Sequence, residues 1–103
     1  MTRLRLVARA SAERDIVGAV AWYDVEAPGM SERFLSEVEA ALARIEAWPS
    51  IGPSVERSVR CVPLRRLPWR VYYELDDTRF EVIAVLHAKR GTEAISDALD
   101  RDE

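Results

Sequence analysis

The chain has few residues that could form covalent or metal-linked scaffolds: its 103 residues include one cysteine, Cys61, and one histidine, His87. A single cysteine cannot form an internal disulfide, and one Cys with one His cannot supply the ligand set of a structural zinc site. We therefore expect no metal and no cofactor. Cys61 lies in an alternating apolar pattern, so we expect it to be a small buried hydrophobic residue.

Long uncharged apolar segments are also missing. No segment approaches the roughly 18–20 residues that a membrane-spanning helix needs. Residues 1–15 carry arginine at positions 3, 5, 9 and 14 between their apolar residues, so they lack the uncharged core of a secretory signal peptide. We expect a cytoplasmic protein without membrane association. The length and the hydrophobic content of 49% predict one domain that spans residues 1–103.

Lysine is nearly absent, because Lys89 is the only lysine among 15 basic residues, and the arginines are unevenly distributed. Residues 57–70 hold five arginines and no acid, whereas residues 93–103 hold five acids and one arginine. The basic cluster suggests a face for an anionic partner. It is equally typical of a solvated sheet face, and the net charge of −3 argues against tight nucleic-acid binding by this chain alone.

The N-terminal half predicts one strand and a pair of helices. Residues 4–8 alternate in a pattern typical of a short strand with a polar outer face. Ser11 is the expected N-cap of a first helix that continues to about residue 25. Pro28-Gly29 interrupts the helical spacing, and a second helix is predicted from about residue 29 to residue 47, with an apolar stripe that ends at Trp48. The short break predicts an antiparallel helical hairpin.

The C-terminal half alternates with period two and predicts three strands, over residues 59–64, 70–75 and 80–87. Pro63 suits an edge position in the first of them. The unbroken apolar run in the third predicts a central strand covered on both faces. Thr92 is a candidate cap of a last short helix. The order β-α-α-β-β-β-α predicts an α+β fold in which the helical hairpin packs on one face of a small, twisted, mostly antiparallel sheet.

A series of short motifs extends along nearly the whole chain: Ala-Trp-Tyr at 21–23, Gly-x-x-x-Arg-Phe-Leu at 29–35, Ala-Trp-Pro-x-x-Gly at 47–52, Arg-x-Leu-Pro-Trp-Arg-Val-Tyr-Tyr at 65–73 and Val-Leu-His-x-x-Arg at 85–90. This ordered set resembles the ParE/RelE superfamily, the toxins of type II toxin–antitoxin (plasmid stabilisation) systems. The resemblance implies a single toxin domain that a cognate ParD-like antitoxin neutralises in a hetero-oligomer. It also implies that operator DNA is bound only through the antitoxin.

RelE-like members of the superfamily cut ribosome-bound mRNA without a metal. That reaction needs a general base, a general acid and cations that stabilise the phosphorane. For such a nuclease, the resemblance implies candidate residues at Arg70, His87 and Arg90. Arginine stays protonated and cannot be the base, and this chain has arginine at positions 60, 65 and 66, where these nucleases often carry lysine.

ParE-like members instead poison DNA gyrase by protein–protein contact, which needs a shaped surface and no acid–base pair. We favour this function for the chain. The alternatives are a ribosome-dependent mRNA endonuclease and a non-toxic module that only binds an antitoxin. The candidate contact residues for antitoxin or target are Arg60, Arg65, Arg66, Trp69 and Tyr72.

The candidate residues also have purely structural interpretations. An imidazole at the end of a strand, such as His87, commonly packs and hydrogen-bonds to neighbouring backbone. Arg70 and Arg90 are equally typical of surface or antitoxin-pairing cations, and exposed ion pairs contribute only about 0–1 kcal/mol. Tryptophan is more often a packing residue than a recognition residue. We predict that Trp48 is in the core and leave both roles open for Trp69.

Overall fold

The computed structural model describes residues 4–90 together with residues 95, 97 and 99. Its elements are β1 (Arg5–Ala8), α1 (Ala10–Glu26), α2 (Met30–Ala47), β2 (Ser54–Glu56), β3 (Val59–Pro63), β4 (Trp69–Leu75), β5 (Arg79–His87) and the 3-10 turn η1 (Ala88–Arg90). The strands form one sheet in the order β1-β5-β4-β3-β2. The β1–β5 pair is parallel and the other described pairs are antiparallel.

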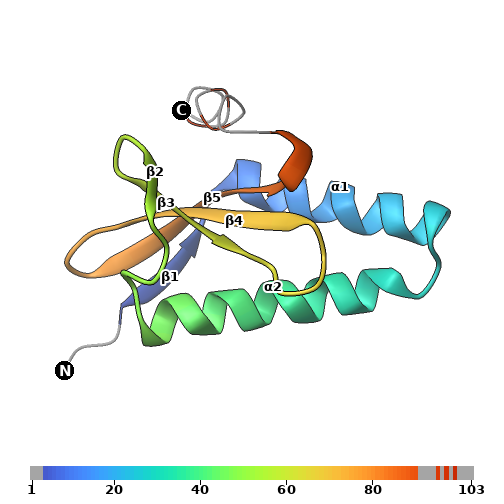
Figure 1. Cartoon of the computed structure of the whole chain (residues 1–103), viewed down its shortest axis with the longest axis horizontal. Helices are drawn as coiled ribbons and strands as arrows, with labels where there is room; N and C mark the ends of the chain where they lie inside the picture. Colours follow the sequence, from blue (N-terminus) through green and yellow to red (C-terminus); the bar gives the residue numbers. More distant parts are fainter. Residues whose placement is uncertain (1–3, 91–94, 96, 98, 100–103) are drawn as a thin grey trace.

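The two long helices run antiparallel and lie across one face of this sheet (Figure 1). The predicted α+β class, the helical hairpin and the mostly antiparallel sheet are therefore confirmed. Within the described residues, neither helix combines the length and the apolar character that crossing a lipid bilayer would require.

Both faces of the sheet are covered. On the helix side, one cluster joins buried residues of the hairpin to the inward side chains of the strands, among them Phe34, Ile45, Tyr73 and Phe80. A second cluster on the other face contains Val59, Cys61, Tyr72, Ile83, Ala84, Leu86 and Ile95. The predictions of a buried Cys61 and of a last strand covered on both faces are therefore confirmed. Thr92, the expected cap of the last helix, lies outside the described residues.

The start of α1 differs from the prediction. Arg9 is the N-cap residue, and Ser11 lies inside the first turn. The Ser11 side chain is fully buried, and its hydroxyl donates a hydrogen bond to the Ile83 carbonyl oxygen at 2.8 Å. The assignment of Ser11 as the N-cap is wrong, because the hydroxyl joins the helix to β5 instead of capping its own backbone.

The strands at the two sides of the sheet also differ from the prediction. In β1, Leu6 is 45% exposed and Val7 is the more buried of the two, because β1 is an edge strand and neither residue reaches a buried cluster.

The short β2 was not predicted, since three residues are too few to show an alternating pattern. β2 pairs with the first part of β3, so β3 as a whole is not an edge strand. The register of that pairing covers Val59 and Arg60, and the rest of the strand to Pro63 lies beyond it.

The segment between α2 and β2 is held by one buried phenol. Tyr73 is 0% exposed, and its hydroxyl accepts a hydrogen bond from the Gly52 N–H at 3.1 Å and donates one to the Pro49 carbonyl oxygen at 2.7 Å. Tyr73→Phe is expected to lower the free energy of unfolding by about 1–3 kcal/mol, because both backbone groups lose their partner. Chemical denaturation measures this loss. Ser50→Ala, in the same segment, is the control, and equal stability of both variants would contradict the prediction.

One buried thiol and two buried phenols predict how the stability of the fold depends on pH in the alkaline range. Burial raises the pKa of the Cys61 thiol and of the Tyr72 and Tyr73 phenols. The native state therefore keeps protons that the unfolded chain releases above about pH 8.5 for cysteine and about pH 10 for tyrosine. The stabilisation that these protonated groups give is fully present below their unfolded-state pKa values. It is lost as the pH rises through the raised pKa values of the folded state. We expect the free energy of unfolding to fall above about pH 9, and to begin falling later in Cys61→Ala; stability that rises in this range would contradict the account.

Candidate functional site

Helix α1 carries apolar residues on two sides. On its inner side it buries Ala12, Ala19 and Tyr23. On its outer side the large apolar residues remain in solvent: Val17 is 68% exposed, Trp22 56% and Val25 76%. Large apolar side chains gathered on an exposed surface often mark a contact with another protein. The outer side of α1, defined here by Val17, Trp22 and Val25, is therefore a candidate contact surface.

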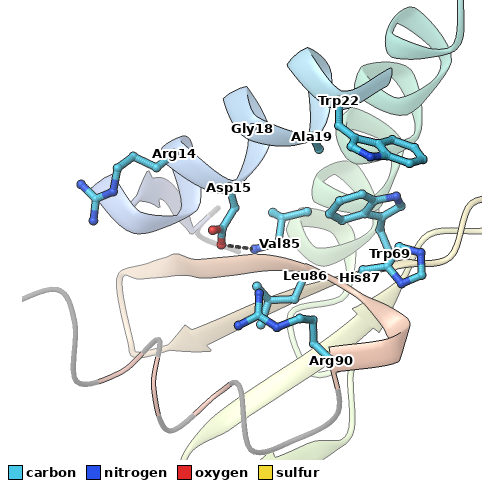
Figure 2. A pocket seen from close by; sticks show the side chains of 10 residues that line it. All are labelled: Arg14, Asp15, Gly18, Ala19, Trp22, Trp69, Val85, Leu86, His87 and Arg90. Atoms are coloured by element: carbon cyan, nitrogen blue, oxygen red, sulfur yellow. Dashed lines mark hydrogen bonds between the residues drawn. The ribbon is translucent and has the colours of Figure 1, made fainter. Parts of the chain in front are cut away.

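Next to this outer side, α1 and the end of β5 enclose an open cleft of about 330 Å³ (Figure 2). Gly18 lines this cleft, and a Cβ added there would lie in open space with no atom within 4 Å. The lining residues are Arg14, Asp15, Gly18, Ala19 and Trp22 from α1, Trp69 from β4, Val85, Leu86 and His87 from β5, and Arg90 from η1.

The cleft exists because β1 is shorter than its neighbour. β1 pairs with β5 only as far as Val82, so among the described residues no strand lies beside the end of β5 on that edge. Two α1 side chains take the place of the strand. The Ser11 hydroxyl bonds the Ile83 carbonyl oxygen, and the Asp15 carboxylate accepts a hydrogen bond from the Val85 N–H at 3.0 Å. Beyond Asp15 the edge lies open to the cleft.

The wall on the sheet side is a rigid aromatic group around Trp69. The Trp69 indole N–H donates a hydrogen bond to the Tyr23 hydroxyl at 2.9 Å. Its ring lies 5.2 Å from that of Phe34 and 5.3 Å from that of His87, in edge-to-face arrangements. On the α1 side, Trp22 packs edge-to-face on Tyr23 at 5.1 Å, and both Trp22 and Trp69 line the cleft (Figure 2). The cleft is thus preorganised for an apolar or aromatic group.

The charges around the cleft are mainly positive. Arg14 and Arg90 both line it and are exposed. Asp15, the one acid among the lining residues, is engaged by the Val85 N–H. A partner segment with an apolar anchor and flanking acidic residues would therefore fit this site.

The residues predicted for a nuclease are only partly brought together, because Arg70 is separated from the other two. In the β4–β5 register, Trp69 lies opposite His87 and Arg70 lies opposite Leu86. Side chains alternate along a strand, so Arg70 points to the face of Leu86 and Cys61, away from His87. Arg70 does not line the cleft, whereas His87 and Arg90 do. Within the described residues, no group of three or more His, Cys, Asp or Glu side chains could hold a metal ion.

His87 has the packing that its position at a strand end suggested. Its ring contacts Trp69, and its Nδ1 accepts a hydrogen bond from the Lys89 N–H at 3.2 Å. In the neutral imidazole the proton then lies on Nε2. The ring is therefore oriented by its neighbours as part of the aromatic wall.

The remaining predicted contact residues differ in exposure. The Arg60 Nη1 donates hydrogen bonds to the Gly52 and Ser50 carbonyl oxygens, at 2.7 and 3.3 Å, so its guanidinium supports the loop before β2. Tyr72 is only 2% exposed and belongs to the second buried cluster, so it offers almost no surface to a partner. Arg65 and Arg66 are exposed.

The prediction that Trp48 is in the core is wrong, since its side chain is 65% exposed. Trp48 is the C-cap residue of α2, with φ −138° and ψ 82°, so the helical spacing that placed it on the apolar stripe has already ended. Trp22 and the outer side of α1 were missed as a contact surface. The signal was present in the sequence, because positions 17, 21 and 25 are apolar at helical spacing, opposite the stripe that was assigned to the core.

Solved structures share the fold of this chain. A chain of the chromosomal ParDE TA system from P. aeruginosa superposes with a TM-score of 0.73 at 16% identity, covering 82% of this chain and 96% of that chain. A mutant of the E. coli toxin RelE in the free state superposes with a TM-score of 0.63 at 20% identity, covering 98% of both chains. No curated protein sequence matches the chain. At these identities the structural likeness shows the fold.

The sequence itself shows the family. Residues 6–91 match the family described as ParE toxin of type II toxin-antitoxin system, parDE. The chain therefore belongs to the ParE toxin family, and the resemblance to the ParE/RelE superfamily is confirmed.

Proposed function

We propose that the chain is a single-domain cytoplasmic toxin that poisons DNA gyrase by protein–protein contact and is neutralised by a ParD-like antitoxin in a hetero-oligomer. One observation favours inhibition by contact over nuclease activity: the β4–β5 register places Arg70 and His87 on opposite faces of the sheet. A nuclease needs its acid, base and phosphate-binding cations around one scissile bond. Contact with a target needs only a shaped, desolvatable surface.

The outer side of α1 and the adjoining cleft supply such a surface. Interface energy is usually concentrated in a few aromatic and arginine side chains near well-packed pockets. Trp22 and Trp69 line the cleft together with Arg14 and Arg90. Trp69 is already fixed by its bond to Tyr23, so little side-chain freedom remains to be lost when a partner docks. This preorganisation supports recognition by contact.

The same surface explains neutralisation. An antitoxin segment that folds as an amphipathic helix over α1 would bury Val17, Trp22 and Val25 and occupy the cleft. Gyrase could then no longer reach them. In this proposal, operator DNA is bound by the antitoxin and not by this chain, whose net charge of −3 disfavours phosphate contacts.

Purified chain added to gyrase tests the proposal. We expect inhibition of supercoiling together with an increase in cleaved-DNA complexes, and reversal of both by the cognate ParD-like antitoxin. Unchanged supercoiling at a large excess of toxin would contradict the proposal. If messenger RNAs on translating ribosomes were then found cut at codon-defined positions, the chain would be an endonuclease. If expression without the antitoxin left growth unaffected, it would be a non-toxic binding module.

A further inference from the structure

A second concave site lies away from the α1 cleft, between α2 and the loop that joins β3 to β4. It is a pocket of about 130 Å³ lined by Glu37, Ala40, Arg44, Arg65 and Arg66. None of these residues lines the α1 cleft. We call it the arginine pocket, because three guanidinium-bearing side chains border this small volume.

The arginines of this pocket are poorly neutralised. Glu37 is the one acid among the lining residues. Its Oε1 accepts a hydrogen bond from the Arg66 backbone N–H at 2.9 Å, and its Oε2 lies 3.7 Å from the Arg33 Nε, outside the pocket lining. The carboxylate is thus directed to a backbone group and to a fourth arginine. The pocket keeps a surplus of positive charge.

Arg44 shows the consequence of this arrangement. Its Nη2 donates to the Pro63 carbonyl oxygen at 3.1 Å, but its Nε is buried and has no hydrogen-bond partner in the part of the chain that the structure describes. Burial lowers the pKa of Arg44, the charge of Arg65 lowers it further, and the charge of Glu37 opposes both effects. Buried donors are nearly always paired in native proteins. A carboxylate from outside, beside the guanidinium groups that border the pocket, would relieve the repulsion between Arg44 and Arg65.

We propose that the arginine pocket receives the carboxylate of an Asp or Glu side chain from a protein partner. Guanidinium forks bind carboxylates through paired, charge-assisted hydrogen bonds. Ala40 provides an apolar wall for the methylene stem of such a side chain. The net charge of −3 disfavours a long nucleic-acid backbone at the same place. The inference rests on the proposed function only in assuming a protein partner; it does not require gyrase.

Nuclear magnetic resonance of the arginine Nε–H groups in the full chain tests this directly. The probes are a short oligoglutamate peptide and a DNA duplex of equal total charge, each titrated against a chloride blank of matched ionic strength. We expect the peptide to shift the Arg44 Nε–H resonance saturably, because a bound carboxylate changes the electric field at the Arg44 guanidinium. An Arg44 resonance that the peptide leaves unshifted would overturn the proposal, and so would tighter binding of the duplex through the same arginines.

Three substitutions test whether peptide binding depends on the arginine pocket or only on the net charge of the protein. Arg65→Gln and Arg66→Gln alter exposed side chains, so the fold should persist, and each is expected to weaken peptide binding by about tenfold. Arg5→Gln removes the same charge from the exposed side chain of an edge strand and should leave binding nearly unchanged. Equal weakening in all three variants would show that only net charge matters and would overturn the proposal. Because no readout involves gyrase, failure here is distinguishable from failure of the proposed function.

Discussion

Phe34→Ala is expected to lower the free energy of unfolding by about 3–5 kcal/mol. Phe34 is 0% exposed, and its ring lies 5.7 Å from that of Tyr23 and 5.2 Å from that of Trp69. It therefore joins α2 to α1 and to the sheet at once. The substitution removes the ring's buried area and leaves a cavity that three separate elements would have to close.

Denaturant unfolding followed by tryptophan fluorescence measures this effect. Leu35→Ala is the matched control, because the neighbouring side chain is 40% exposed and should lose less than about 1.5 kcal/mol. A similar loss in the two variants would show that Phe34 does not hold the hairpin to the sheet.

Trp22→Ala is expected to weaken inhibition of gyrase by about 30-fold, the equivalent of about 2 kcal/mol for an interface hot spot. Trp22 is 56% exposed and lines the cleft beside the outer side of α1. Docking would desolvate its ring, which the free protein leaves in water. Little loss of stability is expected, because much of the side chain makes no contact in the isolated fold.

The control is Trp48→Ala. Trp48 is even more exposed, at 65%, but it follows the end of α2 and does not line the cleft. The concentration of toxin that halves supercoiling should be nearly unchanged in this variant. If that concentration were unchanged in Trp22→Ala, or increased equally in both variants, the outer side of α1 would not be the contact surface.

The elements with strong local signals could be predicted from the sequence. The apolar spacing of α2 and the continuous apolar run in β5 determine how each packs, and the buried faces in the structure follow them. Ser11 could not be assigned in this way. Its hydroxyl bonds a carbonyl group 72 positions away, and no local pattern shows that the helix start will lie beside β5.

The site was only partly predictable for the same reason. Trp69 and the arginines of the β3–β4 loop were identified from residue type. Whether Arg70 and His87 meet depends on the register of β4 against β5, which a single sequence does not show. The shift in register between Tyr72 and Tyr73 makes it harder still to predict which β4 and β5 side chains share a face. On α1, the predicted apolar stripe covers only the inner side, although positions 17, 21 and 25 on the outer side are also apolar.

The central claim is that the chain acts by surface contact and not by proton transfer. Cleaved-DNA complexes formed by gyrase, counted at equal concentrations of wild type, Arg70→Ala and Trp22→Ala, test it most directly. The account predicts that Arg70→Ala forms as many complexes as wild type, while Trp22→Ala forms few. Loss of toxicity in Arg70→Ala with full toxicity in Trp22→Ala, and no gyrase complexes from any form, would contradict it.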